Sequence, residues 1–329
     1  MLTKRQNLLE TIHGGNPEHF VNQYEAFTLV SRTPVSAVSA RPALGGPAVK
    51  DAWGVTKVWP VGTPGPFPVH DKEHIVVKDI THWRDYVKAP CTDYPEEAWA
   101  GAVAMAEKVD RNDQFVTAFI APGVFEQSHY LCEIQNCLIN LYEEPEAMHE
   151  LIDYITEYEL SYAEQLCKYM KPDALFHHDD WGTQASTFMS ADMFEEFFLP
   201  AYKRIYGYYK SHGVELIVHH SDSYCATFVP YMIEMGIDIW QGVMESNNIP
   251  EMIQKYGGKI SFMGGIDSAH VDRPDWTEEM VATQVRRACQ ECGKLYFIPN
   301  ASQGLPVSTF PGVYDALTRQ IDIMSKEMF

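Results

Sequence analysis

The chain has 329 residues, of which 46% are hydrophobic and 21% are charged, values typical of a globular protein with a large apolar core. Its net charge of −20 and isoelectric point near 5.0 argue against nucleic-acid and anionic-membrane binding, because both partners require a basic surface. No stretch approaches the roughly 20 consecutive apolar residues of a membrane span, and the N-terminus lacks the apolar core of a secretory signal. The seven scattered cysteines favour a reducing compartment, so we expect a cytoplasmic protein.

The first part of the chain contains few regular elements. Leu2–His13 is expected to form a helix that ends at two glycines and plugs or flanks the fold, and Val21–Leu29 is expected to form a first strand. Ser31–His82 is rich in proline and glycine, which indicates an excursion of loops and short hairpins. Loops of this length usually form a lid or an interface. A clearer strand follows at Gln114–Ala121.

From Pro145 onward, strands and helices alternate regularly. The expected elements are a helix from Pro145 to Pro172, a strand at Ala174, a helix over Ala191–Tyr209, a strand at Val214, a helix over Ala226–Met235, a strand over Ile237–Val243, a helix over Pro250–Tyr256, a strand at Ile260, a helix over Glu278–Glu291, a strand over Leu295–Ile298 and a helix over Val313–Met328. This alternation requires a mostly parallel sheet with right-handed crossovers. Seven strands are identified, and the eighth is expected in the loop-rich region. We predict a single (βα)8 TIM barrel over residues 1–329, with an excursion at about 31–82.

Polar side chains follow three of the predicted strands. The strand at Ala174 is followed by His177, His178, Asp179 and Asp180, the strand at Val214 by His219, His220, Ser221 and Asp222, and the strand at Ile260 by Gly264, Gly265, Ile266 and Asp267. In a parallel barrel the carboxyl ends of all strands surround one mouth, where the chemistry is placed. The three strand ends therefore offer polar groups to a common site.

His220 and Asp222 are the strongest candidates, because an imidazole and a carboxylate together either bind a divalent metal or act as an acid and a base. Side chains alternate along a strand, so only one of His219 and His220 can face the barrel axis. The second histidine of this pair is expected to be a hydrogen-bonded core residue. His178 and Asp179 form a second pair of catalytic candidates, although two adjacent aspartates at a strand end can equally cap a turn.

Further candidates lie at or near other strand ends. Glu126 and Glu245 each follow a predicted strand and could complete a metal shell or act as a base. Five aromatic residues could stack a planar substrate, although aromatic side chains are equally common in barrel cores. These residues are Tyr24, Phe125, Tyr130, Trp181 and Trp240.

Seven segments in a fixed order carry a resemblance to a known family. They are LTKRQNLLETIHGGNPE, DAWGV, APGVFEQSHYL, FHHDDWGTQASTFMSADMFEEFFLPAYKRI, ELIVHHSDS, KISFMGGIDSA and YFIPNASQGLPVSTFPGVYDAL. With these segments, nearly the whole chain resembles the uroporphyrinogen decarboxylase superfamily, whose members are (βα)8 barrels.

The decarboxylase that gives this superfamily its name carries an arginine-rich MRQAGRY segment, which grips the substrate carboxylates. The corresponding region here reads HFVNQYEAFTL, and no arginine lies between Arg5 and Arg32. A site without those cations, on a strongly acidic protein, should bind a polycarboxylate tetrapyrrole poorly. A metal-independent decarboxylase, with Asp179 or His220 as the proton donor, is therefore only the second choice.

The other large branch contains cobalamin-dependent methyltransferases, in which a zinc ion serves methyl transfer to or from a corrinoid. Members that act on coenzyme M use a His-x-Cys pair after the sixth strand and a cysteine after the last strand. Here these positions read His220-Ser221-Asp222 and Asn300-Ala301-Ser302, so both thiolates are missing. Nitrogen and oxygen ligands leave the ion a harder Lewis acid, which suits activation of an ether oxygen better than activation of a thiolate.

The resemblance therefore implies the methyltransferase component of an aryl-ether O-demethylase, which moves a methyl group from a phenyl methyl ether to the Co(I) of a corrinoid protein. The expected partners are a small aromatic methyl ether and a separate corrinoid protein that carries the cobalamin. Zinc is the expected metal, held by His220 and Asp222 with Glu126 or Glu245, and Asn300 joins the expected substrate-binding residues. The sequence is also compatible with a methyltransferase that uses a different methyl donor, with a non-enzymatic barrel, and with a homodimer.

Overall fold

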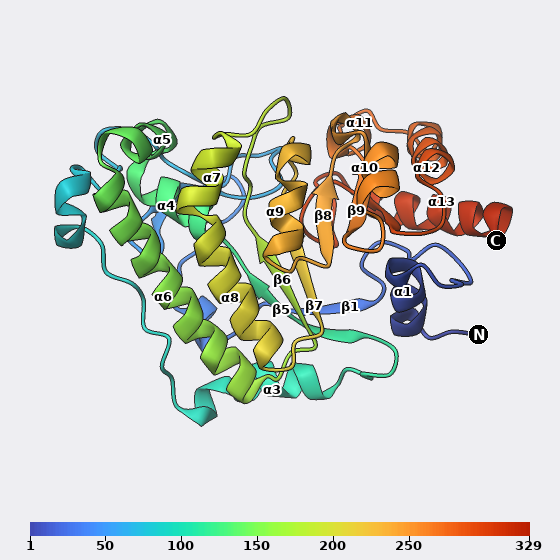
Figure 1. Cartoon of the computed structure of the whole chain (residues 1–329), viewed down its shortest axis with the longest axis horizontal. Coiled ribbons are helices and arrows are strands. Elements are labelled where there is room, and N and C mark those ends of the chain that lie inside the picture. Colours follow the sequence, from blue (N-terminus) through green and yellow to red (C-terminus); the bar gives the residue numbers. More distant parts are fainter.

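The computed structural model describes residues 1–329 and has a curled sheet of seven parallel strands at its centre (Figure 1). The strands are β1 (Phe27–Val30), β5 (Phe115–Ile120), β6 (Ala174–His178), β7 (Leu216–His220), β8 (Ile239–Val243), β9 (Ser261–Ile266) and β10 (Phe297–Ala301). Their spatial order is their order along the chain, so each strand pairs in parallel with the next. Connected by helices, they form a TIM-barrel-like α/β fold, which confirms the predicted fold class.

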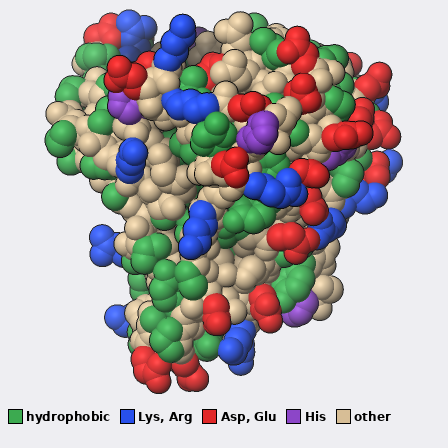
Figure 2. All heavy atoms as spheres, turned by 90° about the vertical axis from the view of Figure 1, so that its left-hand side faces the viewer, with side chains coloured by type: hydrophobic (Ala, Val, Ile, Leu, Met, Phe, Trp, Pro, Cys, Tyr) green, Lys and Arg blue, Asp and Glu red, His purple; other side chains and the backbone are tan.

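Helices cover the outer face of this sheet (Figure 1). The α-helices from Glu96 onward are α3 (Glu96–Glu107), α4 (Val124–Cys132), α5 (Ile134–Glu143), α6 (Pro145–Tyr169), α7 (Ala191–Phe197), α8 (Leu199–Ser211), α9 (Val229–Glu234), α10 (Ile249–Tyr256), α11 (Ser268–Val271), α12 (Glu278–Cys292) and α13 (Val313–Met328), and the 3-10 helices are η1 (Ile80–Asp85), η2 (Ala226–Phe228) and η3 (Glu245–Asn247). None of these helices combines the length and hydrophobicity needed to cross a bilayer. On the face shown in Figure 2, acidic side chains are interspersed with lysine and arginine rather than gathered in one block.

Helix α1 (Lys4–His13) plugs one end of the barrel, as expected. Thr3 caps its first turn through a capping box with Gln6. Its apolar side chains Leu8 and Ile12 join the inward-facing residues of the strands in a single buried cluster. Because the inward residues in this cluster come mostly from the first half of each strand, α1 closes the amino-terminal end and leaves the carboxyl-terminal end for a site.

The excursion after β1 does not supply the expected eighth strand. It contains the short helix α2 (Pro34–Ala37) and a separate three-stranded antiparallel sheet made of β2 (Val49–Lys50), β3 (Thr56–Val58) and β4 (Phe67–Pro68). That part of the prediction was wrong, because the density of proline and glycine breaks the segment into strands too short to extend the parallel sheet. Side chains of this excursion instead line cavities at the carboxyl ends of the strands.

Alternation along β7 separates its two histidines. His219 points outward, where its Nδ1 lies 2.8 Å from the Tyr206 hydroxyl and its Nε2 lies 3.1 Å from the Asp179 carbonyl oxygen. Its ring also stacks on Trp181 at a centroid distance of 3.9 Å. His220 points inward and lines the cavity at the strand ends, as the alternation predicted.

Replacing His219 with Ala should lower the free energy of unfolding by about 1 to 3 kcal/mol, because Tyr206 and the Asp179 carbonyl would lose a buried partner. Chemical denaturation of His219→Ala and of the wild-type protein measures the loss. His270→Ala, at an exposed position, is the matched control and should change stability by less than about 0.5 kcal/mol. Equal stability of the two variants would contradict the buried role of His219.

Candidate active site at the carboxyl ends of the strands

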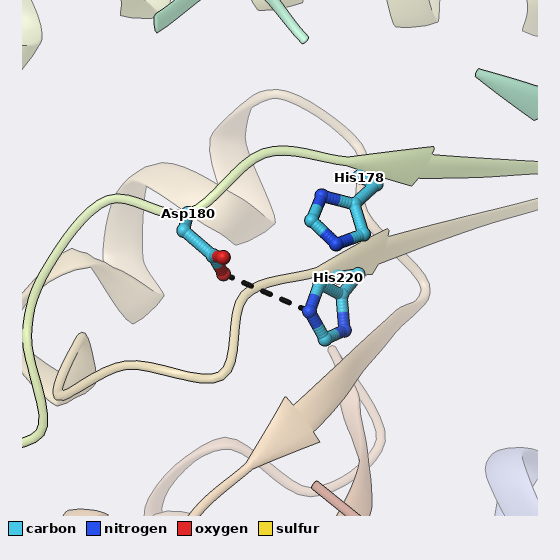
Figure 3. Close-up of side chains that lie close together, drawn as sticks. All are labelled: His178, Asp180 and His220. Carbon is cyan, nitrogen blue, oxygen red and sulfur yellow. Dashed lines mark ion pairs between the residues drawn. The ribbon is translucent and has the colours of Figure 1, made fainter. Parts of the chain in front are cut away.

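Two histidines and an aspartate meet where β6 and β7 end. His178 and His220 are register partners and the last residues of these strands, with ring centroids 4.2 Å apart. Asp180 lies two residues beyond His178 and therefore shares its inward face, and its carboxylate points toward His220 (Figure 3). The Asp180 Oδ1 atom lies 3.7 Å from His220 Nε2. One ligand atom from each of the three residues lies within 4.8 Å of the other two.

Both imidazoles are oriented by hydrogen bonds to their Nδ1 atoms. His178 Nδ1 lies 3.0 Å from Glu126 Oε2, and Glu126 in turn accepts a hydrogen bond from the Tyr130 hydroxyl. His220 Nδ1 donates to Gln241 Oε1, and the Gln241 amide group donates to main-chain carbonyl groups at the end of β10 and just beyond it. These contacts leave the Nε2 atom of each ring available, an arrangement usual for histidines that bind metals.

Glycines at two positions leave room for the two rings. A Cβ atom at Gly304 would lie 2.9 Å from His220 Cε1 and 3.0 Å from His178 Cδ2. A Cβ atom at Gly242, whose φ of +90° already favours glycine, would lie 2.9 Å from the His220 ring. A larger residue at either position would therefore displace the imidazoles.

The charges in this cluster are strongly coupled. Burial lowers the pKa of His178, but Glu126, Asp180 and Asp222 outweigh burial and raise it to about 10. Burial and the neighbouring His178 lower the pKa of His220 to about 4. Burial and the nearby Asp180 hold the pKa of Asp222 well above its ordinary value. Near neutral pH the metal-free cluster therefore contains a protonated His178 and a neutral His220, and burial favours the neutral form of Asp222.

A cavity of about 360 Å³ opens above these side chains. Its walls come from α4, from the ends of β6 and β7, from the excursion and from the loop after β10, and they include Glu126, Tyr130, His178, Asp180, His220, Asp222, Phe67, Phe119, Gly304 and Val307. This volume suits a small molecule. The site is thus a pocket whose wall contains two histidines, His178 and His220, together with the carboxyl groups of Glu126, Asp180 and Asp222.

The donor set fits a divalent metal ion. Two imidazole nitrogens and one carboxylate oxygen are the three protein ligands of many catalytic zinc sites, which keep a further position open. His178, His220 and Asp180 could hold such an ion, and Asp222 supplies another carboxylate in the same cavity. The Nδ1 contacts to Glu126 and Gln241 supply the outer hydrogen bonds that such ligands require.

The structure brings together four of the six acid, base and metal candidates predicted from the sequence. His220, Asp222, His178 and Glu126 all line the cavity. The Glu126 carboxylate lies behind His178 and orients it. Glu245 does not join them: it is half-exposed in η3, and its carboxylate pairs with Arg287 at 3.1 Å.

The position of Glu245 has a local cause. A register irregularity interrupts β8 between Gln241 and Val243, with Gly242 at positive φ. The chain therefore turns away from the cavity before Glu245, which simple alternation does not anticipate.

Asp179 is also not in the cavity, contrary to the prediction. Its carboxylate accepts hydrogen bonds from the backbone N–H groups of Phe125, at 2.9 Å, and Glu126, at 2.8 Å, and from the Tyr202 hydroxyl. It therefore caps the first turn of α4, where a negative charge is favoured. Alternation turns Asp179 outward and Asp180 inward, so the ligand-type aspartate is the next residue along the chain.

Of the five aromatic residues predicted to stack a substrate, Tyr130 lines the cavity and the other four lie in the core. Tyr24, Phe125, Trp181 and Trp240 are all buried, and none of them lines the cavity. Trp181 packs on His219 and Trp240 donates its indole N–H to the Ser221 carbonyl oxygen, so both face the helices. Phe119, near the end of β5, is the inward-facing aromatic side chain that the sequence interpretation missed.

Asn300, the remaining residue predicted to bind the substrate, is not in the cavity wall either. It is buried on β10, and neither its Oδ1 nor its Nδ2 atom has a hydrogen-bond partner. It does not line the cavity at the strand ends. The predicted contact of Asn300 with the substrate is therefore not visible in the cavity wall.

Fold and site together define a TIM-barrel-like protein with a pocket of histidine and carboxylate groups at the carboxyl ends of its strands. The sequence model described as Uroporphyrinogen decarboxylase (URO-D) matches residues 63–322, which is most of the chain. The chain therefore belongs to the uroporphyrinogen decarboxylase family. No curated protein matches it in sequence.

A solved methyltransferase structure shares this fold. A methyltransferase from Methanosarcina mazei superposes with a TM-score of 0.67 at 14% identity, over 98% of this chain and 99% of that chain. An endo-β-1,4-xylanase from Gloeophyllum trabeum matches 70% of this chain and 81% of its own, with 10% identity and a TM-score of 0.40. A D-allulose 3-epimerase from Methylomonas sp. matches 72% of this chain and 94% of its own, with 9% identity and a TM-score of 0.37. The first likeness shows a common fold, and the other two are too distant to support an argument.

Replacing Glu126 with Gln should lower the pKa of His178 from about 10 toward the ordinary value of 6.5, because the closest negative charge is removed while burial is retained. In the metal-free protein, NMR titration of the imidazole nitrogens measures this change. Glu245→Gln removes a charge that lies away from His178 and should leave its pKa unchanged. If His178 titrates at the same pH in the wild-type protein and in Glu126→Gln, the ion pair does not control its charge.

Proposed function

We propose that this protein is the methyltransferase component of an aryl-ether O-demethylase, which transfers a methyl group from a phenyl methyl ether to the Co(I) of a separate corrinoid protein. The observation that carries the proposal is the donor set of His178, His220 and Asp180, which contains only nitrogen and oxygen atoms. No cysteine lines the cavity. Such ligands make a bound zinc ion a hard Lewis acid, suited to an ether oxygen rather than to a thiolate. Family membership and the fold shared with a methyltransferase support a methyltransferase of this superfamily.

Zinc would be held by His178, His220 and Asp180. When bound, the ion supplies a Lewis acid that neutralises negative charge as it develops on the ether oxygen. In the transfer the methyl–oxygen bond breaks, its electron pair stays on the phenolate oxygen, and the methyl carbon forms a bond with the corrinoid cobalt through the electron pair of Co(I).

The side chains around the donor set support this transfer. Glu126 and Gln241 hold the imidazoles through their Nδ1 atoms. Burial and the neighbouring Asp180 raise the pKa of Asp222 well above its ordinary value, which favours a proton on this carboxyl group. That proton can pass from the Asp222 carboxyl group to the phenolate oxygen, so that the product leaves as the free phenol.

The rim of the cavity offers a surface to the corrinoid protein. Two large apolar side chains that line the cavity, Phe67 and Val307, are also exposed. Apolar side chains that surround a pocket are typical of sites where another protein docks.

Replacing His220 or Asp180 with Ala should lower zinc affinity at least about tenfold and reduce methyl transfer in parallel, because a three-ligand catalytic site cannot readily lose one ligand. Elemental analysis of the purified variants and the rate of transfer measure the two effects. The matched control is His219→Ala, which should retain zinc. Full zinc occupancy in an inactive His220→Ala variant would contradict a metal site and favour a metal-free acid and base pair.

Demethylation should depend on a corrinoid protein reduced to Co(I). With methoxybenzene as the donor, phenol and the absorbance of the methylated corrinoid should appear together and in equal amounts, because the two products come from the same bond cleavage. The matched control contains the same corrinoid protein left oxidised, which lacks the nucleophilic electron pair. Phenol formation at the same rate without any corrinoid would contradict the proposal.

A further inference from the structure

A second cavity lies beside the candidate active site. Its volume is about 390 Å³, and its walls come from the excursion after β1, from the end of β5, from α4 and from α6. Phe119, Ala121 and Pro122, near the end of β5 and just after it, line both cavities. A ligand in the second cavity would therefore lie next to the pocket that contains the histidine and aspartate cluster.

Two buried polar side chains of the second cavity lack hydrogen-bond partners. Gln127 on α4 is 3% exposed, and Glu159 on α6 is 5% exposed. Neither Gln127 Nε2 nor Glu159 Oε1 forms a hydrogen bond within the protein. Buried polar atoms are normally paired, and here a donor and an acceptor are left open by residues that line one cavity. A bound molecule that both donates and accepts would complete them.

The position of the Glu159 carboxyl group is fixed by its other oxygen. Glu159 Oε2 lies 2.8 Å from His177 Nε2, and His177 Nδ1 lies 3.0 Å from the Tyr206 hydroxyl. His177 and Tyr206 are fully buried, so these contacts hold the carboxyl group away from solvent. The proton of the first hydrogen bond lies between Glu159 Oε2 and His177 Nε2. Glu159 Oε1 is therefore a hydrogen-bond acceptor, whether that proton is on the glutamate or on the histidine.

The two open atoms do not require a charged ligand. Glu159 already has His177 as its buried partner, and the open donor of Gln127 belongs to an uncharged amide group. Asp51 and Lys57, which also line the cavity, pair with each other at 2.8 Å. An uncharged group that both donates and accepts therefore meets both open atoms, and a hydroxyl is the smallest such group.

Aromatic and apolar side chains line the same cavity. Trp53, Tyr158 and Tyr162 contribute aromatic surface, and Val35 and Ile155 contribute aliphatic surface. The rings of Trp53 and Tyr158 meet edge to face, with centroids 4.8 Å apart. Aromatic walls favour a planar ring, which packs against them in offset or edge-to-face geometry. The ligand that matches the cavity is thus an aromatic ring with a hydroxyl group.

We propose that the second cavity binds a phenolic hydroxyl group, which donates a hydrogen bond to Glu159 Oε1 and accepts one from Gln127 Nε2. The ring of this phenol packs against Trp53 and Tyr158. This inference rests on the proposed function, because the reaction proposed above releases a phenol next to this cavity. The hydroxyl group comes either from that product or from a methyl donor that is itself a phenol.

Binding without the corrinoid protein tests this inference separately from turnover. Calorimetry on the zinc-loaded protein compares phenol with toluene, in which a methyl group replaces the hydroxyl group. Phenol should bind at least about tenfold more tightly, because toluene leaves Gln127 and Glu159 without partners. Equal affinity of the two ligands overturns the inference.

The variant Gln127→Met removes the donor and nearly keeps the size of the side chain. Because Gln127 Nε2 has no hydrogen bond within the protein to lose, this variant should keep the wild-type melting temperature and toluene affinity, while the preference for phenol disappears. The matched control is Gln135→Met, the same change at an exposed position of α5, in which the preference should persist. A phenol preference that survives in Gln127→Met overturns the inference.

Two further comparisons locate the site and identify the source of the hydroxyl group. The variant His220→Ala alters only the first cavity and should retain the phenol preference, whereas its loss would place the phenol at the metal cluster and overturn the inference. If 2-methoxyphenol binds more tightly than phenol, the methyl donor supplies the hydroxyl group. If phenol binds more tightly, the released product supplies it, and both results support the site.

The binding site and the proposed function can fail independently. A phenol preference that depends on Gln127, without methyl transfer from methoxybenzene to Co(I), supports the site and contradicts the proposed function. Methyl transfer together with equal affinity for phenol and toluene does the reverse.

Discussion

The in-register pairing of β6 with β7 is the constraint on which the site depends. It places His178 beside His220 on the inner face and His177 beside His219 on the outer face. A slip by one residue would exchange the faces of one strand and separate the two inner rings. Glu126 and Gln241 can orient the inner imidazoles only in this register.

A buried polar layer outside the barrel stabilises that register. The Tyr206 hydroxyl lies 3.0 Å from His177 Nδ1 and 2.8 Å from His219 Nδ1, and the other nitrogen of His177 lies 2.8 Å from Glu159. These contacts tie α6 and α8 to the two strands. Burial lowers the pKa of His219 well below its ordinary value, so this ring stays neutral. Because an unpaired polar group in this layer would be costly, the outer hydrogen bonds favour the one register that forms the inner cluster.

Much of the fold and part of the site could be predicted from local sequence signals. The alternation of apolar runs with amphipathic helices from Pro145 onward predicted the parallel sheet, and the polar residues at the strand ends predicted His178, His220 and Asp222. The predictions were wrong for residues whose positions depend on contacts with distant parts of the chain or on an irregularity in a strand. Asp179 caps α4, a helix that precedes it by about fifty residues, and a bulge in β8 turns Glu245 away.

The sequence by itself determined that the chain is a parallel α/β protein with histidines and carboxylates at one end of its strands, because strand period and helix period are properties of neighbouring residues. Only the tertiary structure decided which of those side chains meet. Glu126, Gln241 and Gly304 come from three separate parts of the chain, and each contacts a histidine that no local pattern links to it.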